Sequence, residues 1–175
     1  HRDDTVMPDL DIGQSPRPAT YWKYGAQAVE VEVDSETGQV AIKRMVSAHD
    51  CGRAINPLSI EGQIQGGAVM GLGFALIEEM IFDEGRVVNP NLMDYRVPTS
   101  TDFPDVEAII VEAPHREGPF GAKGVGEAST IGAAAAVRSA VAEAVGVTIN
   151  ELPITCEKVL DAIEAQRKEK SLSGS

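Results

Sequence analysis

The fold of this chain is decided first by the stretch AQAVEVEVDSETGQVAIKRMVS, residues 26–47. Apolar and polar residues alternate on both sides of the segment Asp34–Gly38, whose Asp, Ser and Gly residues favour turns. Alternation with a period of two directs one face of a strand towards a core. Two such runs around a turn-rich segment therefore predict a β-hairpin.

A long helix rich in glycine is expected downstream of this hairpin. It spans Leu58 to about Met80, because apolar residues recur at helical spacing along one side: Ile60, Ile64, Ala68, Leu72 and Ala75. Its interior also contains Gly62, Gly66, Gly67, Gly71 and Gly73. Each glycine weakens a helix by up to about 1 kcal/mol relative to alanine, so their number indicates close approach of another backbone or of a ligand. Tight packing between helices explains the pattern equally well.

Short strands are expected after this helix. A second hairpin covers Ile81–Val88, a long irregular loop covers Asn89–Pro104, and a further strand covers Val106–Val111. Irregular loops of this length in a compact domain are usually functional or disordered. The loop is therefore a candidate functional segment.

Two more helices are expected near the end of the chain. One covers Thr130–Val145, with Ser129 or Thr130 as its N-cap and Gly146 as its stop. The other begins after Pro153, with Thr155 as its N-cap. Its buried side is predicted from apolar spacing: Val159, Leu160 and Ile163.

These elements predict an α+β fold in which β-hairpins pack against several helices. Residues 1–20 contain prolines and no sustained periodicity, so they are expected to form an extended arm. Residues 21–165 are expected to form the folded lobe, and residues 166–175 a flexible tail.

Charge and composition exclude several classes of function. The chain has 175 residues, 27 of them acidic and 15 basic, for a net charge of −12. Such a chain repels the phosphate backbone, so a nucleic-acid partner is not expected. No apolar run approaches the roughly 20 residues that span a bilayer. Its two cysteines, Cys51 and Cys156, have no metal-type spacing and predict reduced thiols in a cytoplasmic protein.

The candidate functional segment is Gly118-Pro-Phe-Gly-Ala-Lys-Gly-Val-Gly-Glu127, which leads into a predicted helix. Its four glycines free the backbone to direct several amides at one point, a concavity that suits anions. Lys123 adds a cation. A P-loop is excluded because Lys123 lies between Ala122 and Gly124, and the dinucleotide fingerprint fails because position 129 is serine.

Glu127 is the one carboxylate of this segment. A carboxylate just before a helix is held ionised and can accept a proton as a general base. Acidic residues are also ordinary helix caps, so the spacing alone leaves capping and catalysis both open.

The same segment closely resembles the active-site loop near the end of the molybdenum subunit of the xanthine dehydrogenase and aldehyde oxidase family of molybdenum hydroxylases. Further matches occur in the family's order: His49-Asp-Cys-Gly-Arg-Ala-Ile-Asn-Pro57, Glu61-Gly-Gln-Ile-Gln-Gly-Gly-Ala68, Gly71-Leu-Gly-Phe74 and Asn89-Pro-Asn-Leu-Met-Asp-Tyr-Arg-Val-Pro98. The resemblance covers about residues 20–165 and implies a lobe of a larger molybdenum-binding domain.

The resemblance implies roles for particular residues. Glu127 corresponds to the glutamate that deprotonates a hydroxyl ligand of molybdenum, so that this oxygen attacks an electron-poor carbon of an N-heterocycle or aldehyde. The residues implied to bind the cofactor are Gln63, Lys123, Gly124, Val125 and Gly126. No direct protein ligand to the metal is expected. Cys51 is expected to be structural and His115 to lie on the surface.

The resemblance also implies cofactors and partners. The cofactor is molybdopterin, as a cytosine dinucleotide, with molybdenum, while [2Fe-2S] and FAD are expected on an iron–sulfur and a flavin partner. The chain should act only with the remainder of the molybdenum subunit, on a small-molecule substrate. Two alternatives are a non-catalytic module that binds the pterin or assists assembly, and a chain kept only for subunit contacts.

Overall fold

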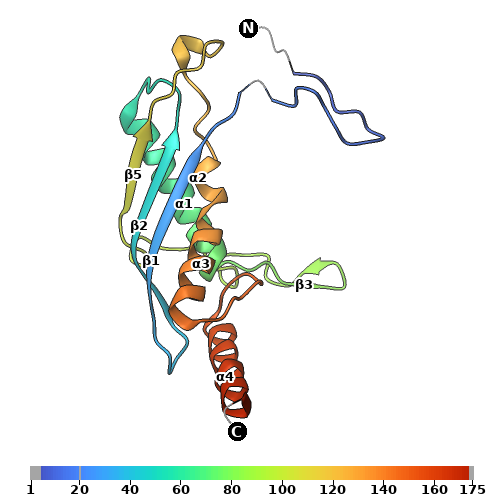
Figure 1. Cartoon of the computed structure of the whole chain (residues 1–175), viewed down its shortest axis with the longest axis vertical. Coiled ribbons are helices and arrows are strands. Elements are labelled where there is room, and N and C mark those ends of the chain that lie inside the picture. The colour runs from blue at the N-terminus through green and yellow to red at the C-terminus, as the bar shows by residue number, and fades with distance from the viewer. Residues whose placement is uncertain (1–4, 20, 174–175) are drawn as a thin grey trace.

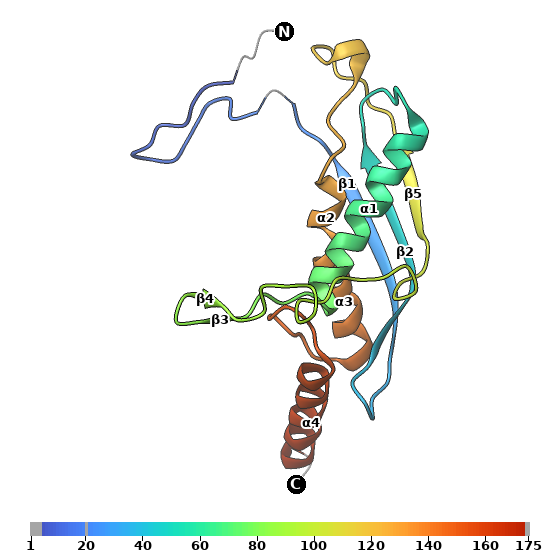
Figure 2. The ribbon, with the colours of Figure 1, turned by 180° about the vertical axis from the view of Figure 1, so that it is seen from behind.

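The structure is a computed structural model that describes residues 5–19 and 21–173 (Figure 1). Its body is a three-stranded sheet in the order β1-β2-β5, covered on one face by helices (Figure 2). The strands are β1 (Gly25–Val33), β2 (Val40–Asp50) and β5 (Val106–Val111), and the covering helices are α1 (Pro57–Leu76) and α3 (Ala133–Val145). The predicted α+β class is confirmed.

Strands β1 and β2 form the predicted hairpin. They pair antiparallel from Gly25 opposite His49 to Val33 opposite Val40. The turn between them is closed by Asp34, whose carbonyl accepts the amide of Gly38 at 2.8 Å. Strand β5 confirms the other predicted strand and lies parallel to β2, so the chain crosses over through α1 to reach it.

Helix α1 confirms the predicted apolar stripe, with Ile64, Ala68, Leu72 and Ala75 buried. Its predicted end near Met80 is wrong, because the helix stops at Leu76. The amides of Ile77 and Glu78 both donate to the carbonyl of Gly73 at 2.8 Å. Because both amides bond to the carbonyl of Gly73, the helix ends here and the chain leaves the helix axis.

The predicted helix over Thr130–Val145 is divided in the structure. A single turn, α2 (Ala128–Ile131), is followed by α3 after a break at Gly132. The expected N-cap at Ser129 or Thr130 is wrong, because both lie inside α2 and Glu127 occupies the N-cap position. The predicted stop is confirmed, since Gly146 has φ 73° and donates its amide to Ala142.

Helix α4 (Cys156–Ser173) is the last element. Its predicted N-cap is confirmed, because the hydroxyl of Thr155 accepts the amide of Lys158 at 3.3 Å. The helix continues through most of the segment expected as a tail. The division into arm, lobe and tail stays a prediction, and its residues 1–4, 20 and 174–175 lie outside the described residues.

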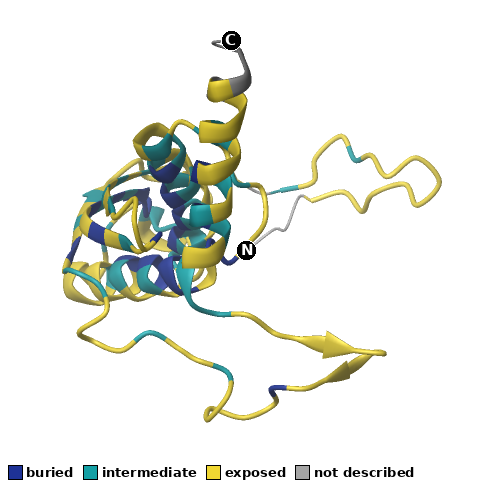
Figure 3. Ribbon diagram, turned by 90° about the horizontal axis from the view of Figure 1, so that it is seen from below, coloured by how far each residue is buried: buried dark blue, intermediate teal, exposed yellow. Residues whose placement is uncertain are grey.

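Two segments extend away from the body and are mostly exposed (Figure 3). One is the N-terminal arm, described over residues 5–19. The other carries the predicted second hairpin, confirmed as β3 (Phe82–Asp83) paired with β4 (Arg86–Val87). Across residues 5–19 and 21–173, no helix combines the length and apolar character needed to cross a bilayer.

The core lies between the sheet and the helices on its covered face. It fixes α1 and α3 against β1 and β2, so the loops at one end of the sheet have a rigid support. Its buried side chains are Ile42, Met45, Ala68, Leu72, Ala75, Val106, Ala133, Val137, Val141, Ile154, Val159 and Ile163.

Candidate functional site

The glycine-rich loop, residues 118–127, is fixed to the backbone that follows β2. Arg53 donates its amide to the carbonyl of Gly121, and Lys123 donates its amide to the carbonyl of Cys51, both at 2.9 Å. Gly52 lies between the two backbones with φ 65°, and a Cβ on it would lie 2.4 Å from the carbonyl oxygen of Gly121. A side chain at this position is therefore excluded by conformation and by space.

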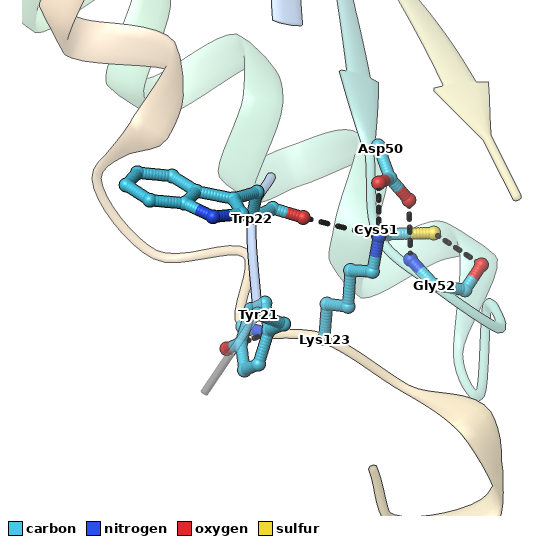
Figure 4. A network of polar contacts seen from close by, with 7 residues as sticks. Tyr21, Trp22, Asp50, Cys51, Gly52 and Lys123 are labelled. Atoms are coloured by element: carbon cyan, nitrogen blue, oxygen red, sulfur yellow. Dashed lines mark hydrogen bonds and ion pairs between the residues drawn. The ribbon is translucent and has the colours of Figure 1, made fainter. Parts of the chain in front are cut away.

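A buried ion pair holds the centre of the loop (Figure 4). The ammonium of Lys123 donates to the carboxylate of Asp50, and their side chains are only 9% and 3% exposed. The same ammonium donates to the carbonyl of Trp22 at 3.2 Å, and Asp50 also accepts the amide of Gly52 at 2.8 Å. Burial opposes ionisation of Asp50, but these hydrogen bonds outweigh it and hold the pKa of the carboxyl below its ordinary value.

The segment before β1 crosses the same loop. The hydroxyl of Tyr21 accepts the amide of Gly124 at 2.9 Å. The ring of Tyr21 lies 5.1 Å from that of His115, tilted by 47°. The expectation that His115 lies on the surface is wrong, because it is half-buried and its Nε2 is enclosed. Residues about 100 positions upstream, such as Tyr21 and Trp22, thus fix the loop at Lys123 and Gly124.

The last residues of the loop are free by contrast. Within the described part of the chain, the amides of Val125, Gly126 and Glu127 donate no hydrogen bond. Glu127 is exposed and occupies the N-cap position of α2, but its side chain makes no capping hydrogen bond. Capping therefore does not explain this glutamate, and its carboxylate is available for other chemistry.

One cavity of about 250 Å³ brings several predicted site residues together. Gln63, Lys123 and Val125 line it with residues of the segment after β2. Gly124 faces Tyr21 instead, and Gly126 and Glu127 are exposed beside it in the chain. The hydroxyl of Ser129 donates to the carbonyl of Gln63 at 3.2 Å, so α2 joins the two halves of the site.

The glycines of α1 divide between packing and open space. A Cβ on Gly67 would lie 2.2 Å from the hydroxyl of Ser129, and one on Gly71 would lie 2.5 Å from Cβ of Ala133. These two permit close packing against α2 and α3. A Cβ added to Gly62 or Gly66 would have nothing within 4 Å. Tight helix packing is therefore confirmed for Gly67 and Gly71, while approach of a ligand at Gly62 and Gly66 stays a prediction.

A second cavity, of about 360 Å³, lies beside α2. Lys23, Gln27 and His49 line it, and each has a buried polar atom without a hydrogen-bond partner within the described chain: Lys23 Nζ, Gln27 Oε1 and His49 Nδ1. Burial lowers the pKa of Lys23 and of His49. These three atoms are thus not hydrogen-bonded within residues 5–19 and 21–173, although Nε2 of Gln27 and Nε2 of His49 both bond to the hydroxyl of Ser47.

A family model described as the molybdopterin cofactor-binding domain matches residues 7–104. The chain belongs to this family. Residues that fit a molybdopterin are present, because a pterin and its phosphate accept hydrogen bonds, the amides of Val125 to Glu127 are unpaired in the described chain, and Val125 lines the same cavity as Gln63. A Cβ added to Gly62 or Gly66 of α1 would also have no described atom within 4 Å.

Relatives support the same family. The xanthine dehydrogenase molybdenum-binding subunit of Escherichia coli O157:H7 is 44% identical over 140 residues, which are 79% of this chain and 19% of that protein. The aldehyde oxidoreductase molybdenum-binding subunit PaoC of Escherichia coli K12 is 35% identical over 91% of this chain and 22% of its own length. The chain thus spans about a fifth of the length of these relatives.

A solved structure has the same fold. Quinoline 2-oxidoreductase from Pseudomonas putida 86 superposes with a TM-score of 0.75 and 40% identity, over 80% of this chain and 18% of its own. The expected resemblance to molybdenum hydroxylases is confirmed at the level of the family, and the chain corresponds to a lobe of such subunits.

Three residues of the site were not predicted from the sequence: Asp50, Tyr21 and Trp22. For Asp50 the sequence did contain an indication. Lys123 is the only charged residue among residues 118–126, and a lysine that is buried in such a loop needs a carboxylate partner. No group of three or more His, Cys, Asp or Glu residues able to hold a metal occurs in the described ranges 5–19 and 21–173.

Proposed function

We propose that this chain forms part of a molybdenum hydroxylase that introduces an oxygen atom from water at an electron-poor carbon of an N-heterocycle or an aldehyde. The reaction converts the C–H bond and water into C–OH, two protons and two electrons. The observation that carries the proposal is the unpaired carboxylate of Glu127, at the free end of a fixed loop in a chain of this family.

The residues proposed to hold the cofactor are those of the loop and of α1: Gln63, Lys123, Gly124, Val125 and Gly126. Support comes from the cavity that Gln63, Lys123 and Val125 share, and from the free amides of Val125 and Gly126. The ammonium of Lys123 is already paired with Asp50, so its contribution is to shape the cavity wall. When bound, the molybdopterin, proposed as a cytosine dinucleotide, supplies the redox centre that accepts two electrons.

Glu127 is proposed as the general base. Its carboxylate accepts the proton of the hydroxyl that forms the new C–O bond, which raises the nucleophilicity of that oxygen. A carboxylate that capped a helix would lose its hydrogen bond to a backbone amide when it took up a proton. Glu127 makes no capping hydrogen bond, so protonation of its carboxylate breaks none. The carboxamide of Gln63 can orient a bound group by donating and accepting hydrogen bonds.

Partners are proposed from the electron balance. The two electrons have to leave the redox centre for an acceptor, and the family resemblance supports [2Fe-2S] on an iron–sulfur subunit and FAD on a flavin subunit, in the cytoplasm, as that acceptor. The remainder of the molybdenum subunit would complete the substrate site, since the chain spans about a fifth of its relatives.

The experiment is a Glu127→Gln substitution in the complete complex, with kcat and molybdenum content measured together. A general base contributes typically 10²–10⁴-fold, so kcat should fall by at least about 100-fold while molybdenum content stays within twofold of the wild type. Glu117→Gln is the matched control, because Glu117 precedes the same loop and, among the described residues, pairs only with its neighbour Arg116. Its kcat should be unchanged.

The opposite outcome is informative too. If Glu127→Gln retains wild-type turnover, the catalytic assignment fails and a non-catalytic role in cofactor binding or assembly replaces it. If molybdenum content also stays unchanged in Gln63→Ala and Gly126→Ala variants, the chain serves only subunit contacts.

A further inference from the structure

Asp50 and Lys123 form a buried ion pair, and the role assigned to it rests on the proposed function of Glu127. Lys123 is the only charged residue among residues 118–126, and in an anion-binding loop its ammonium would be expected to face the ligand. In the structure it is only 9% exposed and donates to Asp50 and to the carbonyl of Trp22. Its charge is therefore satisfied inside the protein.

A buried ion pair contributes little net stability, because desolvation of the two charges offsets their attraction. What such a pair does provide is a fixed geometry, since each partner is costly to leave alone. Asp50 here connects three segments: the end of β2 with Gly52, whose amide it accepts, the loop through Lys123, and the segment of Trp22 through the shared ammonium. The loop can take few positions that keep all these contacts.

The contacts end three residues before the proposed base. Gly124, whose amide donates to Tyr21, is the last loop residue with a hydrogen bond to another segment in the described chain, and Glu127 follows without one. Displacement of the proton-accepting group by about 1 Å costs about 100-fold in rate in many enzymes. On its far side Glu127 is followed by the buried Ser129, whose hydroxyl donates to the carbonyl of Gln63. On its near side, the position of Glu127 depends on how firmly Lys123 and Gly124 are held.

We propose that Asp50 is a positioning residue of this site, acting through Lys123 to hold the loop that presents Glu127. Lys123 then serves as the partner of Asp50 and not as the cation that binds the cofactor. Neutralising either Asp50 or Lys123 should loosen the loop in the same way. Neutralising both should lower the rate little further than neutralising one. If Lys123 bound the cofactor directly, its substitution would still lower cofactor occupancy in a protein in which Asp50 is already neutral.

The test compares Asp50→Asn, Lys123→Met and the double variant in the complete molybdenum-binding subunit within its complex. Hydrogen exchange of residues 118–127 is measured on the cofactor-free subunit, and kcat, KM and molybdenum content on the loaded complex. Each single variant should exchange at least threefold faster over this segment and lose about 10–100-fold in kcat, with KM and molybdenum content within twofold. The fold-loss of kcat in the double variant should equal that of the worse single variant and not the product of the two single losses.

The double variant also guards against misfolding, because it leaves no uncompensated buried charge. Glu107→Gln is the matched control: it breaks the exposed pair of Arg44 and Glu107, 2.6 Å apart, and should change none of the readouts. Wild-type exchange and kcat in the double variant would overturn the proposal. So would a loss of molybdenum in Lys123→Met that is absent in Asp50→Asn, since it would assign Lys123 to the cofactor.

The outcome for Glu127 separates this inference from the proposed function. If Glu127→Gln abolishes turnover while Asp50→Asn leaves exchange and kcat unchanged, only the positioning role fails. If Glu127→Gln retains turnover, the proposed function fails, and the exchange data alone still report whether Asp50 holds the loop.

Discussion

The two halves of the glycine-rich loop differ in almost every contact they make. The first half, up to Gly124, is bonded to the segment after β2, to Asp50 and to Tyr21. The second half, from Val125 to Glu127, makes no such hydrogen bond in the described chain and is mostly exposed. Rigid support and unpaired reactive groups are thus divided between neighbouring residues, so substitutions in the two halves should affect different properties.

The largest effect on stability is expected from Gly52→Ala, which disrupts the fixed half. Its φ of 65° is strained for alanine, and the new Cβ would lie within 2.7 Å of backbone atoms of Gly121 and Lys123. We expect a loss of about 3 kcal/mol, measured by denaturant unfolding. Gly85→Ala is the control, because Gly85 has φ 81° and nothing within 4 Å. It should cost only about 1 kcal/mol; equal losses would show that the close backbone contact does not matter.

The next effect is a dependence on pH. The pKa of Asp50 is lower folded than unfolded, so its stabilisation is present above its unfolded pKa, about 3.9, and is lost as pH falls through the folded value. Relative to Asp50→Asn, the wild type should be about 2 kcal/mol more stable at pH 7, and this difference should shrink below pH 4. Unfolding curves at pH 7 and pH 3 measure it. A difference that stays constant would contradict the sign of the pKa shift.

A smaller effect is expected from Tyr21→Phe. It removes the hydroxyl that accepts the amide of Gly124 but keeps the ring beside His115. One hydrogen bond contributes about 1 kcal/mol, and the same unfolding measurement should show this loss. Tyr24→Phe is the control, since Tyr24 is 73% exposed. If the two variants are equally stable, the bond to Gly124 is not formed in solution.

The smallest effect is expected in the free half. Gly126→Ala should change stability by less than about 0.5 kcal/mol, because nothing lies within 4 Å of the added Cβ. Its molybdenum content should nevertheless fall if the amide of Gly126 contacts the cofactor. A loss of stability above about 1 kcal/mol would show that this half packs against the protein after all.

Local patterns predicted the hairpin over residues 26–47 and the buried stripe of α1, because alternation and helical spacing depend only on residues close together in the sequence. The proposal for Glu127 also rests on neighbouring residues, because the resemblance that implies it is carried by the motif of residues 118–127. Asp50 as partner of Lys123 was not predicted, since the two are 73 positions apart and meet only when the sheet has formed. The start of α2 was also misplaced, because serine at position 129 bonds to Gln63 of another helix instead of capping its own.

The separation of these contacts along the chain has a consequence for folding. Hydrogen bonds of the loop join residues 101 and 103 positions apart, as Lys123 with Trp22 and Gly124 with Tyr21. Contacts of high sequence separation form late, because the entropy of closing a long loop is lost before they are gained. The hairpin and α1 should therefore be in place before the glycine-rich loop acquires its native conformation. A ligand held by that loop would therefore bind after the hairpin and α1 have folded, and its binding would stabilise the last segment to reach its native conformation.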